Sequence, residues 1–346
     1  MQVNIPLIKT IDNSYDITID TIPTTHFDTK VAIVTNPKVA GLHLAYLLSK
    51  ISAKELYIIT VPDGEEYKNQ DSINLILESL FNHRFNRKSM LIAFGGGVIG
   101  DMTGYAASIY QRGIDFVQIP TTLLSQVDAS VGGKTGMNNS YGKNLIGAFH
   151  QPKAVYIDSL FLSTLPKREF SAGVAEIVKM AVTFNKDFFE FLENADLHDN
   201  VVLKQAIEQA VQTKANVVAQ DEKEHGLRAA LNYGHTFGHV IENETKYKKY
   251  LHGEAVAIGM VMANEMAVSM GLMSKDEALR IKQFLQKYDL PTSYKIENHL
   301  SFYETFFLDK KSSDAKITFI IPEGIGGVKI TDEVDRELAL SVLKDF

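Results

Sequence analysis

The stretch MLIAFGGGVIGD, residues 90–101, contains the signals that decide the fold class. Residues 90–94 form a short, continuous apolar run, which is typical of a strand buried on both faces of a parallel sheet. Three glycines follow at once, and the residues after them begin a helix. A strand, a Gly-rich turn and a helix in this order indicate an α/β unit.

Four further apolar runs of the same kind lie on either side of this stretch. They are VAIVT (31–35), LYIITV (56–61), FVQIP (116–120) and AVYID (154–158). The segments at 39–50 and 71–84, between the first three runs, have the periodicity of amphipathic helices. This alternation predicts a doubly wound α/β domain with a parallel sheet.

The pattern changes after about Pro166, where long helical segments replace the short strands. Helical periodicity covers 168–184, 201–222, 231–253, 253–271 and 275–289. Residues 316–331 have the pattern of a hairpin with a Gly-containing loop. A chain of 346 residues also exceeds the usual size of one core. We therefore predict a Rossmann-like α/β domain over residues 1–160 and a mainly helical domain over 161–346.

Composition excludes several classes of protein. A net charge of −7 argues against general nucleic-acid binding, which needs a basic surface. The absence of cysteine excludes disulfides and thiolate sites and fits a reducing cytoplasm. The first residues lack the charged and apolar pattern of a signal peptide, and Asn264 and Glu265 interrupt the longest apolar helix. We expect a cytoplasmic protein without membrane spans.

The glycines after the central run allow two interpretations. Gly95, Gly97 and Gly100 fit the spacing G-x-G-x-x-G, in which the backbone approaches a pyrophosphate at a helix N-terminus. However, the motif follows the third strand, and the acidic Asp101 comes at once instead of about twenty residues later. The pattern alone is equally compatible with a tight structural turn.

A polar, Gly-rich segment at 120–147 follows the run that ends at Pro120. Its GGKTG sequence suggests a P-loop, but Asp128 occupies the position of the first required glycine, so this interpretation fails. What remains is a long loop at the carboxyl end of a strand, where open α/β sheets bind ligands. Lys134 and Lys143 in this loop suit a phosphate group.

Two later motifs carry candidate metal ligands. In AGVAEIVKMA (172–181), Glu176 and Lys179 are three residues apart, and such a pair is ordinarily a surface ion pair. However, the small residues around them predict partial burial. A partly buried carboxylate needs a cation, so Glu176 is a candidate metal ligand. In LNYGHTFGHVIENETKYKKYLHG (231–253), His235 and His239 are one helical turn apart and could bind one ion. A zincin is excluded because threonine follows His235.

These motifs together resemble the 3-dehydroquinate synthase family. The resemblance rests on five segments in the same order along most of the chain, at 95–138, 142–152, 171–181, 226–242 and 251–260. It implies the NAD-dependent conversion of 3-deoxy-D-arabino-heptulosonate 7-phosphate (DAHP) to 3-dehydroquinate and phosphate, the second step of the shikimate pathway. In this chemistry NAD oxidises a hydroxyl, phosphate is eliminated, the ketone is reduced again, and an intramolecular aldol reaction closes the ring.

The resemblance also implies a role for individual residues. The family uses one divalent ion, usually zinc with cobalt able to substitute, and its ligands fall on Glu176, His235 and His252. His239 then faces the substrate and handles protons, with Asn232. The implied substrate-binding residues are Arg112, Asp128, Lys134, Asn144, Lys179, Lys214, Arg228, Asn232, His239 and one of Lys310 and Lys311. Catalytic roles are expected for His239, Asn232, Lys179, Asp128 and Lys134.

The implied NAD contacts come mostly from the first half of the chain. They are Asn36, Lys38, Glu65, Lys68, Gly96, Gly97, Val98, Asp101, Thr121, Thr122, Lys143, Phe161, Leu162, Ser163, Thr164 and Ala172. Arg112 is expected to reach the site of a neighbouring subunit, which implies a homodimer. Alternatives are another sugar phosphate cyclase, such as a 2-deoxy-scyllo-inosose or sedoheptulose-phosphate cyclase, a metal-dependent polyol dehydrogenase, and a non-enzymatic NAD-binding module.

Overall fold

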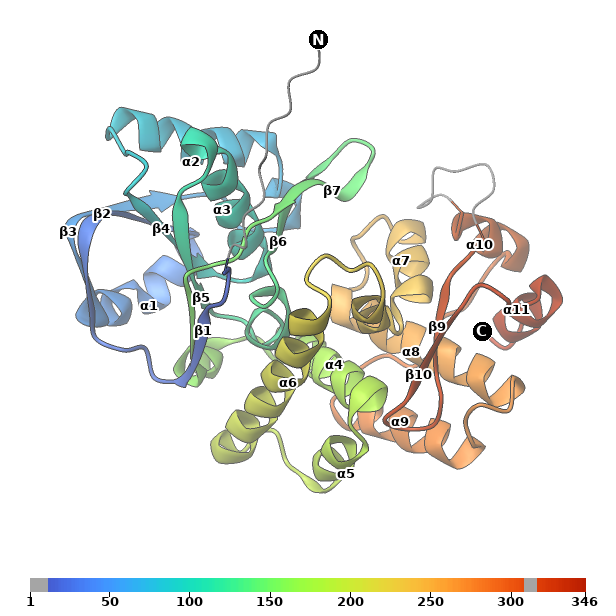
Figure 1. Ribbon diagram of the computed structural model, residues 1–346. Helices are drawn as coiled ribbons and strands as arrows, with labels where there is room; N and C mark the ends of the chain where they lie inside the picture. Colours follow the sequence, from blue (N-terminus) through green and yellow to red (C-terminus); the bar gives the residue numbers. More distant parts are fainter. Residues whose placement is uncertain (1–11, 308–315) are drawn as a thin grey trace, which may run out of the picture.

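A six-stranded parallel sheet forms the centre of the N-terminal half of the molecule. The computed structural model describes residues 12–307 and 316–346. The sheet has the strand order β1-β8-β5-β4-β2-β3 (Figure 1). Its strands are β1 (Asp16–Asp20), β2 (Thr25–Thr35), β3 (Ile51–Thr60), β4 (Met90–Gly95), β5 (Asp115–Pro120) and β8 (Ala154–Asp158). The predicted parallel α/β sheet is confirmed.

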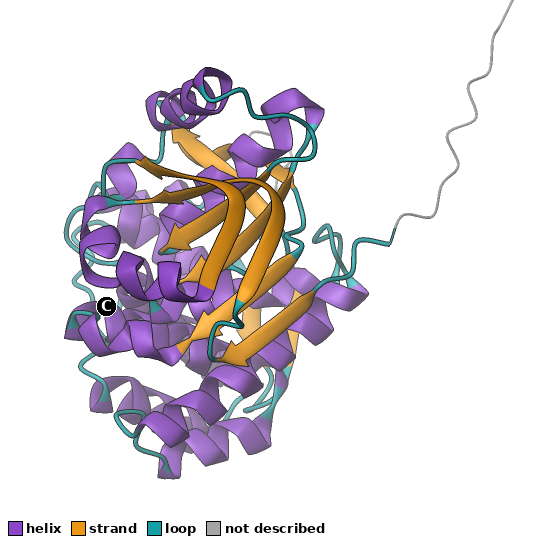
Figure 2. Cartoon of the chain, turned by 90° about the vertical axis from the view of Figure 1, so that its left-hand side faces the viewer, coloured by secondary structure: helices purple, strands orange, loops and turns teal. Residues whose placement is uncertain are grey.

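Helices cover both faces of this sheet, as Figure 2 shows. They are α1 (Pro37–Lys50), α2 (Gln70–Asn82) and α3 (Gly97–Ile109). Asn36 and Asn69 cap α1 and α2 by accepting hydrogen bonds from main-chain N–H groups of the first turn. The apolar residues of the central strands are almost fully buried between these helices, because both faces of the sheet are covered.

Strand β1 escaped the sequence analysis. Its sequence DITID alternates exposed and half-buried residues, and it pairs in parallel with β8 at the end of the sheet. The other strands of the sheet were predicted from continuous apolar runs, and DITID has none, because polar residues alternate with its two isoleucines. β1 therefore could not be predicted from apolar periodicity.

The long loop predicted at 120–147 is wrong as a description of that segment. It begins with the π-helical turn η3 (Ser125–Ala129) and continues as an antiparallel hairpin of β6 (Lys134–Asn139) and β7 (Gly142–Phe149). Leu145 and Phe149 are exposed on this hairpin. The Gly and Asn residues that suggested an irregular loop instead allow close strand pairing and a tight turn between the strands.

The C-terminal half is mainly helical, as predicted. Its helices are α4 (Lys167–Phe184), α5 (Lys186–Asn194), α6 (Asn200–Gln220), α7 (His235–Glu244), α8 (His252–Ser269), α9 (Lys275–Lys287), α10 (His299–Thr305) and α11 (Arg336–Leu343). The hairpin of β9 (Phe319–Pro322) and β10 (Val328–Thr331) packs beside them. Short 3-10 turns complete the chain: η1 (Glu65–Tyr67), η2 (Tyr110–Arg112), η4 (Ser159–Thr164) and η5 (Leu227–Asn232).

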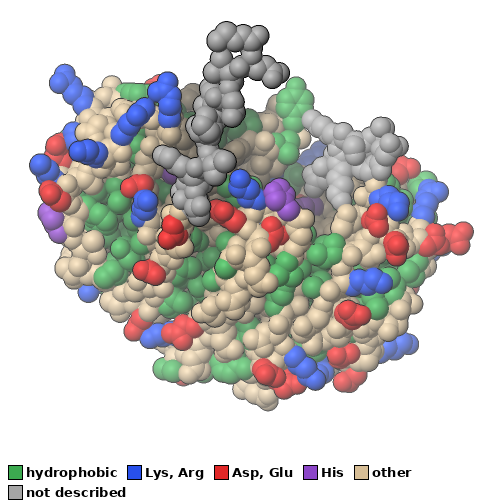
Figure 3. All heavy atoms as spheres, in the orientation of Figure 1, with side chains coloured by type: hydrophobic (Ala, Val, Ile, Leu, Met, Phe, Trp, Pro, Cys, Tyr) green, Lys and Arg blue, Asp and Glu red, His purple; other side chains and the backbone are tan. Residues whose placement is uncertain are grey.

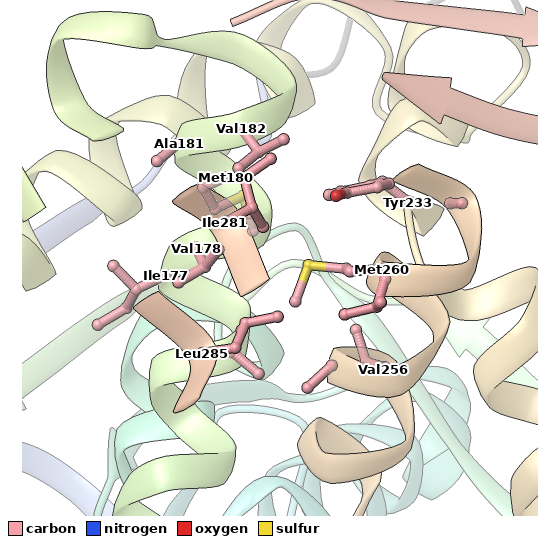
Figure 4. Packing of buried hydrophobic residues seen from close by; sticks show 14 of the residues in the cluster. Ile177, Val178, Met180, Ala181, Val182, Tyr233, Val256, Met260, Ile281 and Leu285 are labelled. Carbon is pink, nitrogen blue, oxygen red and sulfur yellow. The ribbon is translucent and has the colours of Figure 1, made fainter. Parts of the chain in front are cut away.

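Helix α8 is the centre of the second core. Its residues Val256 and Met260 pack against Val178 of α4 and Leu285 of α9 in one continuous apolar cluster (Figure 4). Asn264 is also buried: its Oδ1 accepts a hydrogen bond from Tyr233 at 2.5 Å, whereas its Nδ2 has no hydrogen-bond partner among the described residues. Within residues 12–307 and 316–346, no helix is long and apolar enough to cross a membrane.

Candidate active site and metal centre

Three side chains from three helices meet at the candidate metal centre. Glu176 lies in the middle of α4, while His235 and His252 are the first residues of α7 and α8. One ligand atom from each of them lies within 4.8 Å of the other two. The predicted set Glu176, His235 and His252 is therefore brought together by the fold, although the residues are far apart in sequence.

The hydrogen bonds of the two histidines leave one nitrogen of each ring available. Nδ1 of His235 lies 3.2 Å from the carbonyl oxygen of Tyr233, which only accepts, so Nδ1 carries the proton and Nε2 is free to bind a metal. Nδ1 of His252 lies 3.4 Å from the Glu242 carboxylate, and its Nε2 lies 3.8 Å from Glu176. A carboxylate or carbonyl behind each imidazole is the usual arrangement around a bound zinc ion.

The electrostatics of the three residues fit a divalent cation. Glu176 is completely buried, and its Oε1 has no hydrogen-bond partner among the described residues, while Oε2 contacts Lys179 at 2.5 Å. A buried carboxylate oxygen without a partner is costly unless a cation satisfies it. Burial and the charge of Lys179 lower the pKa of His235 well below its usual range, so this ring is neutral, as a ligand must be.

A second possible set shares one member with the first. His239, Glu242 and His252 also have ligand atoms within 4.8 Å of one another. However, Glu242 already has Lys143 at 3.1 Å and the His252 ring as partners, so its charge is compensated. The buried set around Glu176 is therefore the better metal site, and the pairing of His235 with His239 that their spacing suggested is not required.

A chain of buried charges runs from the metal centre toward the sheet. Lys179, which contacts Glu176, also lies 3.6 Å from Asp128 in the turn η3, and Lys214 of α6 donates to Asp128 at 2.8 Å. Burial raises the pKa of Asp128, but the two lysines outweigh it and hold this pKa well below its usual range. The ordinary reading of Glu176 and Lys179 as a surface pair is wrong, because both side chains are buried.

The other predicted substrate residues surround the outer end of this chain. Lys134 pairs with Glu224, which also accepts a hydrogen bond from Asn232 at 2.8 Å. Arg228 is buried and donates to the main-chain oxygens of Gly132 and Glu222. These lysine, arginine and amide groups are of the kind that binds an anionic substrate.

Several predicted cofactor residues, among them Asn36, Gly96 and Thr121, follow the carboxyl ends of strands of the main sheet. Gly96 begins α3 without a capping side chain, which leaves the N–H groups of the first turn available to an anion such as a pyrophosphate. The hydroxyl of Thr121 is buried without a partner among the described residues. These free donors and the nearby glycines fit a dinucleotide, which favours the functional reading of the Gly-rich turn over the purely structural one.

Further residues of the predicted cofactor set form short polar networks. Lys68 donates to both Asp101 and Asn144, so a predicted cofactor residue and a predicted substrate residue are in contact. Glu65 accepts a hydrogen bond from Asn138 at 2.7 Å. Asn36 caps α1, and Lys38 is exposed in the first turn of that helix. Asn144 therefore stands where the two predicted sites meet.

The predicted cofactor residues of η4 differ in exposure. Phe161 and Leu162 have buried side chains, Thr164 contacts His43 at 2.7 Å, and Ser163 is exposed. Ala172 is buried against α8. The remaining predicted contacts, Gly97, Val98 and Thr122, lie near the start of α3, with Gly97 and Val98 in its first turn and Thr122 facing Gly96.

Arg112 and the two late lysines are the last of the predicted substrate residues. Arg112 is exposed in η2 with a φ of 71°. Lys310 and Lys311 lie outside the described residues. The role of Arg112 therefore stays a prediction about a second subunit.

Figure 3 shows a histidine together with acidic and basic side chains near the middle of the upper part of this face.

The sequence analysis missed Glu242. It follows His239 by three residues on α7 and His235 by seven, so helical periodicity places it on the same face as both histidines. Its carboxylate joins Lys143 of the β6–β7 hairpin to His252. Hydrogen bonding to His252 and the charges of that ring and Lys143 overcome burial and lower the pKa of Glu242 to about 2. An acid three residues after a candidate ligand was the available signal.

Comparison with known proteins agrees with this arrangement. Residues 58–172 match the family model described as 3-dehydroquinate synthase N-terminal, and residues 173–312 match 3-dehydroquinate synthase C-terminal. A 3-dehydroquinate synthase of Sulfurimonas denitrificans is 74% identical over 346 residues, which cover 100% of this chain and 99% of that protein. The chain belongs to the 3-dehydroquinate synthase family.

Solved structures of related cyclases share the whole fold. A 2-epi-5-epi-valiolone synthase of Streptomyces hygroscopicus, with NAD⁺ and Zn²⁺ bound, superposes with a TM-score of 0.88 at 26% identity, covering 99% of both chains. A 2-deoxy-scyllo-inosose synthase, complexed with carbaglucose-6-phosphate, NAD⁺ and Co²⁺, has a TM-score of 0.81 at 27% identity, covering 94% of this chain and 92% of that one. This dehydroquinate synthase family member therefore shares its fold with other sugar phosphate cyclases.

Proposed function

We propose that the protein converts DAHP to 3-dehydroquinate and phosphate, the second step of the shikimate pathway, with NAD and one divalent ion. The observation that carries the proposal is the continuous set of buried charges in which Lys179 joins Glu176 of the metal centre to Asp128. An enzyme that handles a hydroxylated acid phosphate needs a metal site directly beside fixed cations. Glu176 of α4 would contribute to the metal site, and Lys179 of α4 and Lys214 of α6 are the fixed cations beside it.

NAD would supply a reversible two-electron acceptor, and the divalent ion a Lewis acid at the centre formed by Glu176, His235 and His252. Lys179 and Lys214 are held in place by Asp128, so their charges are oriented before the substrate arrives. Lys134, Arg228 and Asn232 would bind the anionic and hydroxyl groups at the outer side. His239, on the same face of α7 as His235, would accept or return hydroxyl protons.

The nearest alternative is a cyclase for a different sugar phosphate. The two solved structures belong to such enzymes, and at 26% and 27% identity they share this fold without fixing the substrate. The match to both halves of the 3-dehydroquinate synthase model and the 74% identity to a protein of that name favour DAHP. A non-enzymatic NAD-binding module is disfavoured by the complete charge network beside the metal centre.

The test follows phosphate and NADH in the same reaction. Purified protein with zinc, catalytic NAD and DAHP is expected to release phosphate while no NADH accumulates, because the cofactor returns to its starting state. Lys179→Ala should release much less phosphate, since it removes the cation between Glu176 and Asp128. Turnover of sedoheptulose or glucose phosphates with DAHP untouched would favour another cyclase, and net NADH formation from a polyol would favour a dehydrogenase.

Two further features belong to the proposal. We infer a homodimer in which Arg112 enters the neighbouring site, because this arginine is exposed and has no ion pair among the described residues of its own chain. We also propose that the protein is located in the cytoplasm, and the absence of cysteine supports this location.

A further inference from the structure

Three consecutive residues at the start of α8 meet three residues of α4 that are spaced one helical turn apart. Glu254 pairs with Arg168, Gly253 packs against Ala172, and His252 faces Glu176. Arg168, Ala172 and Glu176 are four residues apart in succession, so they form one stripe along α4. The metal ligands Glu176 and His252 are therefore the last members of a row of contacts that begins at Arg168.

The first contact in this row is a two-pronged ion pair. Nε of Arg168 donates to Oε1 of Glu254 at 2.6 Å, and Nη2 donates to Oε2, also at 2.6 Å. Nη2 also donates to the main-chain oxygen of Lys249 at 2.7 Å. Such a paired geometry fixes direction as well as distance. Arg168 thus holds both the first turn of α8 and the loop before it.

Glu254 in turn contacts Leu251, the residue before His252. Its Oε2 accepts a hydrogen bond from the main-chain N–H of Leu251 at 2.8 Å, which caps the helix. The loop before it includes Lys246 and Tyr247, both with positive φ, so this approach to α8 is not a regular element. A ligand at the first position of a helix depends on such contacts, because the helix does not continue before it.

The contact between Gly253 and Ala172 is too close for any side chain at position 253. A methyl group at Gly253 would lie 2.1 Å from the carbonyl oxygen of Ala172, so only glycine allows α8 to approach α4 this closely. The two helices therefore touch through their backbones beside His252. Close approach places His252 near Glu176, while the ion pair on the other side of Gly253 sets how the first turn is rotated.

We propose that Arg168 is a positioning residue for the metal centre. By clamping Glu254 and the carbonyl of Lys249, it holds the first turn of α8 so that Nε2 of His252 stays within reach of Glu176. This inference rests on the proposed metal site and adds a residue that touches neither metal nor substrate. Loss of a partner that orients a ligand commonly weakens metal binding about 10-fold to 100-fold.

The test measures zinc affinity and stability separately. Arg168→Gln and Glu254→Gln are titrated with zinc against a competing chelator, and each metal-free variant is also melted. The control is Arg280→Gln, because Arg280 makes the same two-pronged contact with Glu193 between α9 and α5, away from the metal centre. We expect the dissociation constant for zinc to rise about tenfold or more in the first two variants and to stay unchanged in the control.

The outcomes separate positioning from general stabilisation. If the Arg168–Glu254 ion pair is merely structural, metal-free Arg168→Gln should melt at a lower temperature, as Arg280→Gln should. Its zinc affinity would then equal that of the wild type, and this result would overturn the proposal. If Arg168→Gln does not fold, Glu254→Gln decides alone. The double variant should bind zinc no more weakly than either single variant, because both remove one interaction. Wild-type protein that takes up no zinc would instead overturn the proposed metal site, and this inference with it.

Discussion

Glu176 is the residue on which the candidate site depends most. It is completely buried on α4 with one carboxylate oxygen lacking a hydrogen bond among the described residues. A polar atom left in this state typically costs about 1–3 kcal/mol. A cation bound at this oxygen would compensate the cost.

The two histidines that could accompany Glu176 are expected to respond differently to substitution. His252→Ala should weaken metal binding more than about 100-fold, beyond the range for partners outside the ligand set, because it removes a ligand. His239→Ala should retain the metal but lose turnover, because its ring lies in the other, charge-compensated set. Metal content after dialysis checks this prediction, and equal losses in both variants would contradict it.

The sequence could identify these residue types but not their partnership. Helical spacing correctly places His235 and His239 on one face of α7, whereas the joining of His235 to Glu176 and His252 depends on how three helices pack. That set came from the family resemblance. Glu242 was missed because no local pattern shows that its carboxylate turns toward a histidine in the next helix.

Among the elements, the turn between α6 and η5 is organised by a single carboxylate. Asp221 accepts hydrogen bonds from the main-chain N–H groups of His225, Gly226 and Arg228. These bonds lower the pKa of Asp221 to about 2, those of His225 and Arg228 contributing most. The turn leads directly into η5, which carries Arg228 and Asn232.

Asp221→Asn is expected to weaken this turn in a pH-dependent way. The pKa is lowered on folding, so the ionised carboxylate stabilises the fold above its unfolded pKa, and this contribution is lost as the pH falls through about 2. The difference in melting temperature between wild type and variant should therefore be largest near neutral pH and shrink on acidification. The KM for DAHP should also rise. A difference in melting temperature that does not depend on pH would contradict this account.

Elements buried on both faces were predictable, and the others less so. The five apolar runs all became strands of the main sheet; four of them are inner strands, where burial between helices favours apolar residues, and β3 is an outer strand with Ile58 exposed. The hairpin of β6 and β7 was mistaken for a loop, since its strands are rich in Gly, Asn and Lys and lie outside the main sheet. Their conformation depends on pairing with each other and packing on α3, not on local apolar periodicity.

For the whole molecule, the open question is whether one subunit completes the site of another. If Arg112 enters the neighbouring site, subunits with Arg112→Ala and subunits with Lys179→Ala are each inactive alone but form one complete site in a mixed dimer. A random mixture then recovers about a quarter of wild-type activity, because half of the dimers are mixed and each has one intact site.

The measurement is phosphate release after co-refolding or co-expression of the two variants. Arg112 acting within its own subunit would give no recovery, because no site in a mixed dimer would then contain both side chains. Matched mixtures of each variant with itself provide the baseline. A monomer in solution would likewise contradict the prediction.

The two halves predicted from the sequence are both present, but their cores are not separate. The apolar cluster of the helical half includes Leu123 and Val127 near η3 and Val155 and Ile157 of β8. The periodicity of apolar residues shows where strands give way to helices along the chain. It does not show that side chains from both halves pack in one core. The boundary near residue 160 therefore stays a prediction.

The pairing of β1 with β8 has a consequence for the order in which the fold is completed. Asp16 aligns with Ala154, so the first strand of the chain has no place in the sheet until the strand that ends the N-terminal half has been synthesised. During translation, the strands β2, β3, β4 and β5 are synthesised before β8, which is the pairing partner of β1. β1 can therefore join the main sheet only after β8 has emerged, and its charged, alternating sequence disfavours pairing with other edge strands in the meantime.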